Sequence, residues 1–379
     1  MASSMTSPAS QRQQPGHGAV APTTAAPGPG RDARLDNAKF VLIALVVVGH
    51  AIGSLDYGPA STLYYWIYFF HMPAFIMISG YLSRSFDASS KRVEKLVLSL
   101  LVPYLVFWTI HQSIYAVERG GLPDSMSVLQ PTYALWFLVA LFLWRLSVPI
   151  WKRLRWPVLI AVAISVFGAT ASLGGTLSLG RVVSFLPFFV LGLCLRREHF
   201  AYLDRLWVRI ASVLVLGVTA VLAVPISEHM SRSWLFWSSS LTDRDIDPIL
   251  PSLGLRMGFM VLALVMTFAV LALMPKQRTW FTPLGAYTLY VYLGHSVVIV
   301  LFQALPWYGH LSGVMEMTVV ILAALGVTLL LCTPWVRAGM RWAVEPQLTW
   351  FLREDSALRA PNGAGNGDGG AREKEKAGV

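Results

Sequence analysis

The chain contains about ten apolar runs that are each long enough for a helix to cross a lipid bilayer. They cover residues 37–55, 61–82, 96–116, 131–150, 157–173, 181–196, 207–226, 252–274, 283–305 and 313–335. Apolar residues make up 55% of the sequence and charged residues only 13%, which excludes an ordinary soluble domain. We therefore expect an all-α fold, a polytopic membrane helix bundle of about ten transmembrane helices.

Lysine and arginine gather in every second connection between these runs, which predicts the orientation of the bundle. Short loops rich in Lys and Arg stay on the cytoplasmic side. The basic connections carry Arg84, Lys91, Arg92, Lys95, Lys152, Arg153, Arg155, Arg196, Arg197, Arg205, Lys276 and Arg278. Both termini are therefore predicted to be cytoplasmic, in a multi-pass protein of the plasma membrane. The same asymmetry explains much of the net charge of +10, so we expect no nucleic-acid partner.

Residues 1–33 and 355–379 are rich in small and polar residues and are predicted to be disordered tails around one membrane domain at residues 34–354. Cys194 and Cys332 both lie in apolar segments near predicted cytoplasmic ends, where thiols stay reduced. We expect them to be small core residues. No metal-ligand spacing is found in the sequence, and no metal is expected.

Three histidines fall at a similar depth in three of the predicted helices. At about 1.5 Å per helical residue, His50 lies roughly 21 Å, His71 roughly 16 Å and His295 roughly 18 Å from the cytoplasmic ends of their helices. Ionisable side chains at such depth face the bundle interior and mark functional sites. A single histidine can equally be a hydrogen-bonding group between helices, but three in one layer favour a functional site. His111 lies further out and is either part of an outer vestibule or structural.

Six segments, in order along residues 34–335, resemble the acyltransferase 3 family of integral membrane O-acyltransferases, and most closely its fucose 4-O-acetylase-like branch. The segments are "RLDNAKFVLIALVVVGHAI", "YFFHMPAFIMISGYL", "KRVEKLVLSLLVPYLVFW", "LWFLVALFL", "RVVSFLPFFVLGL" and "LGAYTLYVYLGHSVVI". The resemblance implies an enzyme that transfers acyl groups other than aminoacyl groups. The acyl group, usually acetyl, would come from cytoplasmic acetyl-CoA as co-substrate. The acceptor would be a hydroxyl of a sugar, a surface glycan or a small natural product.

The resemblance also assigns residues. The family has a basic residue and a histidine on its first helix that are separated by ten intervening positions, and Lys39 and His50 fit that spacing. Its first cytoplasmic loop often carries an Arg-x-x-Arg pair, here Arg92 and Lys95. The lysine is a departure, because it lacks the planar fork with which arginine grips a phosphate. In an enzyme of this kind Arg84, Lys91, Arg92 and Lys95 would meet the phosphates of coenzyme A.

The chemistry of acyl transfer fits the histidines independently of the resemblance. A hydroxyl is a poor nucleophile at neutral pH, and an imidazole can take its proton as it attacks a thioester. We therefore expect His50 to be the general base or a covalent acyl carrier, and the sequence leaves both open. His71, two residues before Pro73, would orient His50 or polarise the thioester carbonyl.

The remaining candidates concern the acceptor and the entrance to the site. Asp36 lies three residues before Lys39 on one helix face, as an interfacial anchor or as part of the donor entry. Arg181 either snorkels to the interface or points into the outer half of the cavity. Trp136 could stack on a sugar or pack in the bundle, and His295 is expected to contact the substrate.

A second class of function remains open from the sequence. The chain could be a polytopic transporter or exporter in which the buried histidines relay protons. No internal repeat and no paired broken helices, the usual marks of secondary transporters, are found in the sequence. The acyltransferase is therefore the favoured prediction.

Overall fold

The computed structural model describes residues 32–121, 126–171, 173, 175–237 and 249–346, and these residues form helices and connections without a β-strand. The helices are α1 (Ala33–Ile52), α2 (Gly58–Leu82), α3 (Ser90–Leu96), α4 (Val102–Arg119), α5 (Trp136–Trp151), α6 (Pro157–Thr170), α7 (Leu179–Cys194), α8 (Arg197–Tyr202), α9 (Leu206–His229), α10 (Ser233–Phe236), α11 (Ile249–Leu273), α12 (Thr288–Gln303), α13 (Val314–Leu331) and α14 (Pro334–Val344). A π-helical turn, Val97–Leu101, joins α3 to α4. The predicted tails at residues 1–33 and 355–379 lie almost wholly outside the described residues.

Each of the ten predicted runs holds a helix of the structure, which confirms the polytopic helical bundle. Seven helical stretches among the described residues are long and apolar enough to cross a membrane: α1, α3 with α4, α5, α7, α9, α11 and α13. The other three runs correspond to α6 and α12, which are shorter apolar helices, and to α2, which has 25 residues but many tyrosines. Length and composition together are therefore those of a membrane-spanning protein.

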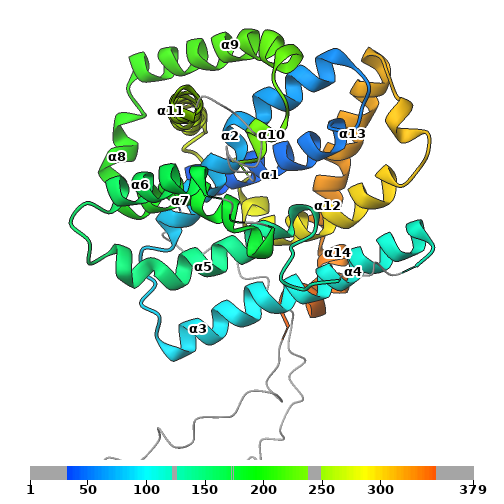
Figure 1. The fold of residues 1–379 in the computed structure, drawn as a ribbon, viewed down its shortest axis with the longest axis horizontal. Coiled ribbons are helices and arrows are strands. Elements are labelled where there is room, and N and C mark those ends of the chain that lie inside the picture. Colours follow the sequence, from blue (N-terminus) through cyan, green and yellow to red (C-terminus); the bar gives the residue numbers. More distant parts are fainter. Residues whose placement is uncertain (1–31, 122–125, 172, 174, 238–248, 347–379) are drawn as a thin grey trace, which may run out of the picture.

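The helix α1 lies in the middle of the bundle, between the more peripheral α9 and α4 (Figure 1). Of its candidate membrane-spanning segment 78% is buried, compared with 17% for α9 and 22% for α13. Large apolar side chains of α9 are exposed instead, among them Leu206 at 73% and Val221 at 71%. Lipid tails are as apolar as these side chains, so a peripheral membrane helix exposes them without cost.

The predicted basic connections gather at one end of the bundle. The Arg34 guanidinium, at the start of α1, donates to the carbonyl of Phe200 at 3.0 Å and also pairs with Asp204. Lys276, after α11, pairs with the same Asp204 at 2.8 Å. The segment that follows α2 joins this end too, because Lys152, after α5, donates to the carbonyl of Phe86, and Arg84 donates to that of Leu195. We call this end the basic face.

The alternate connections meet at the opposite end. Arg232, which follows α9, donates to the carbonyl of Gly53 at 2.5 Å and to the Ser61 hydroxyl at 3.1 Å. The Tyr308 hydroxyl, after α12, donates to the carbonyl of Ala51 at 2.8 Å. The alternation of loops between the two ends agrees with the sequence prediction. That the basic face is the cytoplasmic one stays a prediction from the charge rule.

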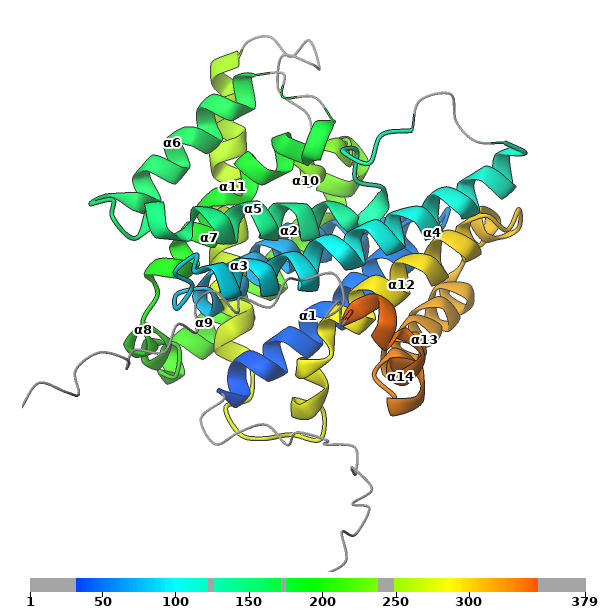
Figure 2. The ribbon, with the colours of Figure 1, turned by 90° about the horizontal axis from the view of Figure 1, so that it is seen from below.

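The helices α2 and α7 cross closely in the middle of the bundle, behind α5 in the view of Figure 2. A Cβ added to Gly80 would lie 2.1 Å from the carbonyl oxygen of Phe189, and one added to Gly192 would lie 2.1 Å from that of Met77. Glycine on both helices lets the two backbones touch, as small residues do at helix contacts in membranes. The crossing holds the second half of α2 in place, and α2 carries His71.

One expectation about the cysteines is wrong. Cys332 is buried, as predicted for a small core residue, but Cys194 is exposed. Cys194 is the last residue of α7, where the helix ends and its surface is no longer covered by a neighbour. Both thiols are free.

Candidate active site

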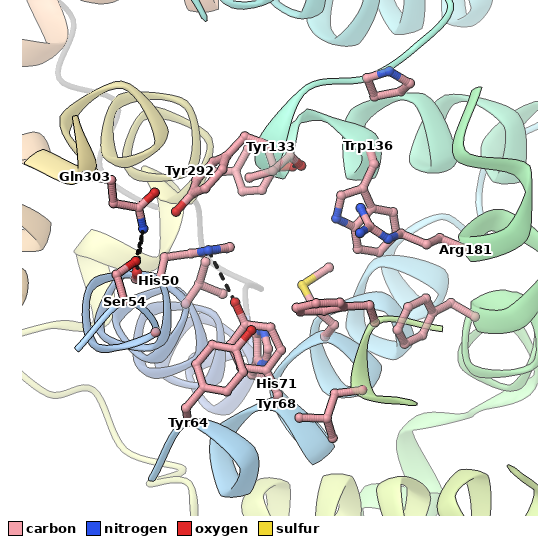
Figure 3. Close-up of a pocket in the computed structure, with 18 residues that line it drawn as sticks. His50, Ser54, Tyr64, Tyr68, His71, Tyr133, Trp136, Arg181, Tyr292 and Gln303 are labelled. Carbon is pink, nitrogen blue, oxygen red and sulfur yellow. Dashed lines mark hydrogen bonds between the residues drawn. The ribbon is translucent and has the colours of Figure 1, made fainter. Parts of the chain in front are cut away.

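A cavity of about 400 Å³ lies inside the bundle near the end opposite the basic face. Its walls come from α1, α2, α5, α7 and α12 and from the short α10 (Figure 3). Gly53 and Ser54 at the end of α1 and Gln303 at the end of α12 mark its outer limit. No carboxylate lines it among the residues that the structure describes. Such a mixed cavity, with a few polar groups on apolar walls, is the usual form of a small-molecule site.

The imidazole of His50 projects from α1 into this cavity (Figure 3). Its Nδ1 lies 3.3 Å from the hydroxyl of Tyr68, and its ring centre lies 4.9 Å from that of Tyr133. The amide of Gln303 donates to the Ser54 hydroxyl at 3.0 Å and holds the end of α1 next to α12. His50 is thus fixed by aromatic rings and one hydroxyl rather than by a charged neighbour.

His71 reaches the same cavity from α2 and has a defined tautomer. Its Nδ1 lies 2.9 Å from the carbonyl oxygen of Ile67, which can only accept, so Nδ1 carries the proton and Nε2 is an acceptor. Its ring packs against Tyr68 at 4.5 Å between centres, and Tyr68 in turn contacts His50. The helix continues through Pro73 without ending, although a proline removes one hydrogen bond from the helix ladder.

His295 lies directly beside His50, at 5.4 Å between ring centres, and is fully buried. Its Nδ1 donates to the carbonyl of Val291 at 2.9 Å, so its Nε2 is also an acceptor. That Nε2 has no hydrogen-bond partner within the described part of the chain. The three histidines placed in one layer by their depth are therefore brought together, His50 with His295 directly and His50 with His71 through Tyr68.

His111 extends this group away from the cavity. Its Nε2 lies 3.0 Å from the hydroxyl of Ser296, the residue that follows His295, and its Nδ1 lies 3.3 Å from the hydroxyl of Thr132. Both hydroxyls can donate or accept. His111 does not line the cavity, and its hydrogen bond to Ser296 links α4 to α12.

Arg181 points into the cavity from α7, on the side opposite His50 (Figure 3). Its guanidinium lies 5.2 Å from the ring centre of Trp136, an arrangement in which a cation is attracted to the face of an aromatic ring. Trp136 also stacks on Phe185 at 5.5 Å between centres. A ligand in this cavity therefore lies between an imidazole on one wall and a guanidinium on an indole on the other.

Asp36 and Lys39 do not reach the cavity. They form an ion pair of 2.8 Å between Nζ and Oδ1 near the start of α1. Lys39 is eleven residues from His50, which is about 16 Å along a helix. Its predicted part in the chemistry stays a prediction, and the structure puts it at the basic face.

Two of the four predicted donor-binding residues line a second pocket at that face, with a volume of about 290 Å³. Arg92 and Lys95 contribute to it together with Arg145 of α5. Arg84 does not: it stacks on the Tyr81 ring at 3.6 Å and bonds to the Leu195 carbonyl. Lys91 is exposed on α3 and is not among the residues that line this pocket.

Among the residues that line these two sites, sequence reasoning missed Tyr68, Tyr133, Gln303 and Arg145. An arginine inside the apolar run 131–150 is a signal that could have found Arg145, because charges in a membrane helix are rare and functional. The tyrosines carry no such signal, because tyrosine is enriched at membrane interfaces. Gln303 carries none either, because it lies near the end of its apolar run.

Comparison with known proteins agrees with this architecture. A family model described as an acyltransferase domain, Acyl_transf_3, matches residues 32–334. The match covers most of the chain, nine of the ten predicted runs in full and all but the last residue of the tenth. The chain therefore belongs to the acyltransferase 3 family, as the six sequence segments predicted.

Two curated relatives carry the same name, nodulation protein NolL. The protein of Mesorhizobium japonicum is 32% identical over 183 residues, which cover 43% of this chain and 47% of the relative. The protein of Sinorhizobium fredii is 31% identical over 181 residues, covering 43% of this chain and 48% of the relative. The chain thus spans about half the length of these relatives. No solved structure matches the chain.

No group of three or more His, Cys, Asp or Glu side chains within the described ranges could hold a metal ion.

Proposed function

We propose that the protein is a multi-pass O-acyltransferase of the plasma membrane. It transfers an acyl group, acetyl in the simplest case, from cytoplasmic acyl-CoA to a hydroxyl of a sugar, a surface glycan or a small natural product. The observation that carries the proposal is the cavity in which His50 faces Arg181, in a chain of the acyltransferase 3 family. The family supports the reaction class, and the cavity supports the assignment of roles.

In this proposal His50 acts on the acceptor. The acceptor hydroxyl attacks the carbonyl carbon of the thioester, a new C–O bond forms, and His50 takes the hydroxyl proton as general base. The C–S bond then breaks, and the sulfur of coenzyme A leaves as a thiolate that regains a proton. The Tyr68 hydroxyl, 3.3 Å from Nδ1, orients the imidazole until the acceptor replaces it as a partner.

The other residues of the cavity divide between the two substrates. Arg181 supplies positive charge where the carbonyl oxygen becomes negative or where an acceptor oxygen binds. Trp136 offers an aromatic face to a sugar ring, although its stacking on Phe185 also packs the bundle. His71 and His295 present acceptor nitrogens, because each donates its Nδ1 proton to its own helix.

A covalent acyl-histidine on His50 is the second form of the same proposal. In that form the imidazole attacks the thioester first, and the acceptor hydroxyl then takes the acyl group from the nitrogen. The two forms differ in whether label from the donor stays on the protein when no acceptor is present.

The test is release of coenzyme A and transfer of label from radiolabelled acetyl-CoA in native membranes. Membranes with the wild type, with His50→Ala and with His229→Ala at matched expression are compared with membranes that lack the protein. We expect turnover by the wild type and by His229→Ala, because His229 is exposed at the end of α9. His50→Ala should lose about 100- to 10,000-fold in rate, the usual contribution of a general base.

The outcomes separate the alternatives. Equal turnover by His50→Ala would assign His50 a structural role. If neither the wild type nor a variant consumes acetyl-CoA above the level of membranes that lack the protein, the proposed donor is wrong. The transporter alternative then replaces the acyltransferase proposal. The labelled product, once isolated, identifies the acceptor.

A further inference from the structure

We propose that Arg145, together with Arg92 and Lys95, forms the site that binds the phosphate groups of the acyl donor. This inference rests on the proposed function and extends it to a residue that lies inside a membrane helix. Arg145 is six residues from the end of α5, which is about 9 Å along the helix. Its position is therefore too deep for a charge that only sets the orientation of the chain.

The guanidinium of Arg145 is half-buried and lacks an ionic partner among the described residues. Its Nε donates to the hydroxyl of Ser83 at 3.1 Å, and no other hydrogen bond of its side chain is found in that part of the chain. Guanidinium has five N–H donors in a fixed fork. Four donors are therefore free for a ligand, and a half-buried cation without a counter-charge is costly unless a ligand supplies one.

The pocket around Arg145 contains the chemistry for an anion. Arg92 and Lys95 of α3 contribute two further cations, and Ser83, Ser85 and Ser99 contribute hydroxyls. No carboxylate lines the pocket within the described residues. Asp87 is near, with its Oδ1 3.5 Å from the Nε of Arg92, but it is more than half exposed and does not line the pocket. Arginine forks match phosphate oxygens in pairs, so the pocket is suited to a phosphate or pyrophosphate.

The location favours a donor phosphate over a lipid headgroup. The pocket adjoins the basic face, where a donor from the cytoplasm is predicted to arrive. The pocket and the cavity are both lined by residues of α2 and α5 or of their ends. Ser83 is twelve residues from His71, about 18 Å along the axis of α2. Arg145 is nine residues from Trp136 on α5. In acyl-CoA a long pantetheine arm separates the phosphates from the thioester, as this arrangement requires.

The experiment measures donor KM and kcat of purified protein in vesicles of phosphatidylcholine, for acetyl-CoA and for its 3′-dephospho form. The variants are Arg145→Gln, Arg145→Lys and the control Arg153→Gln, which removes an exposed charge at the same face. We expect Arg145→Gln to raise the KM for acetyl-CoA about 10- to 100-fold, the loss of a charge-assisted hydrogen bond, with a smaller change in kcat. The KM of Arg145→Lys should lie between those of the wild type and Arg145→Gln, and the KM of Arg153→Gln should match that of the wild type.

Calorimetry measures the affinity for coenzyme A without turnover. It therefore tests the inference even for a variant that has lost activity. Unchanged affinity in Arg145→Gln would overturn the inference while leaving the proposed function intact. If the wild type binds coenzyme A but transfers no acetyl group, the proposed function is overturned while the inference about the phosphate site stands. A KM that is insensitive to Arg145 but an activity that depends on added phosphatidylglycerol would assign the pocket to a lipid headgroup and also overturn the inference.

Discussion

At the residue scale, the two histidines that flank His50 share one hydrogen-bonding pattern. His71 and His295 each donate Nδ1–H to the carbonyl four residues earlier in the same helix, at 2.9 Å. A side chain held in this way has one tautomer, and its Nε2 is left as an acceptor. In the proposed reaction His50 takes a proton and becomes a cation, and two neutral acceptor nitrogens near it would stabilise that charge. We therefore predict that the flanking histidines matter to the reaction more than to the fold.

Replacing His295 by leucine tests this distinction. The Nε2 of His295 is buried without a partner among the described residues, so a leucine of similar size removes an unsatisfied group and should not lower stability. We expect the melting temperature to be unchanged or higher and kcat to fall about 10- to 100-fold, the value of a hydrogen bond to a charged group. His229→Leu, at an exposed position, serves as the control. Full activity in His295→Leu would make His295 a packing residue.

The depth of a residue could be predicted from the sequence, but its neighbours could not. Counting 1.5 Å per residue placed His50, His71 and His295 in one layer, and the structure brings them together. The same count could not say that Arg145 of α5 donates to the Ser83 hydroxyl at the end of α2. Depth follows from position along one helix, whereas contacts depend on how neighbouring helices are rotated.

At the scale of elements, α2 and α7 are held together by the absence of side chains at two positions. Gly80 and Gly192 each face a backbone carbonyl of the other helix, at a distance that no Cβ can occupy. The contact aligns the part of α2 that follows His71 with the part of α7 that follows Arg181. Both sides of the cavity therefore depend on this crossing.

Replacing Gly80 by alanine should push the helices apart. A Cβ at this position would meet the carbonyl of Phe189 at 2.1 Å, and a backbone atom cannot yield as a flexible side chain does. We expect the free energy of unfolding to fall by about 1–3 kcal/mol, the usual cost of overpacking. Gly217→Ala on α9 is the matched control, because nothing lies within 4 Å of its Cβ. Denaturation in detergent micelles measures both, and equal stability of the two variants would contradict the expectation.

The helices themselves were predictable because a membrane sets their length. All ten apolar runs became helices, including the weak runs at 157–173 and 181–196, now α6 and α7. The start of α3 was missed: its helix begins at Ser90 rather than near residue 96. The added turns are polar and lie outside any apolar run. The π-helical turn that follows α3 was not predicted from the sequence either. Pro103 explains it, because a proline has no N–H to donate to the carbonyl of Ser99 and so disrupts the regular helix ladder.

At the scale of the whole molecule, an ion cluster at the basic face joins three distant segments. Asp204 accepts from Arg34 at the start of α1 and from Lys276 after α11. Partial burial raises the pKa of the Asp204 carboxyl, but its hydrogen bonds to Lys276 and Arg34 outweigh burial, and the net pKa is lowered. The cluster therefore stabilises the fold above the ordinary Asp pKa and ceases to do so as the pH falls through the lowered value.

Asp204→Asn should reveal this dependence on pH. Near neutral pH the variant is expected to melt at a lower temperature than the wild type, because two cations lose their partner. As the pH falls below about 4, the wild-type carboxyl also loses its charge and the difference should shrink. Asp56→Asn removes an exposed carboxylate from the opposite face and should show no such convergence. A difference that stays constant from neutral to acid pH would exclude the ion cluster as its cause.

The orientation of the bundle decides whether the two pockets can serve one reaction. The pocket around Arg145 must face the cytoplasm to meet acyl-CoA, and the cavity near Gly53 and Gln303 must then open toward the outside. With Cys194 and Cys332 replaced by alanine, a cysteine at exposed Ser231 should react with a membrane-impermeant maleimide on intact cells. A cysteine at exposed Ser89 should react only after the cells are permeabilised. The reverse result would mean that the pocket around Arg145 faces away from the cytoplasmic donor, and the proposed direction of acyl transfer would then be wrong.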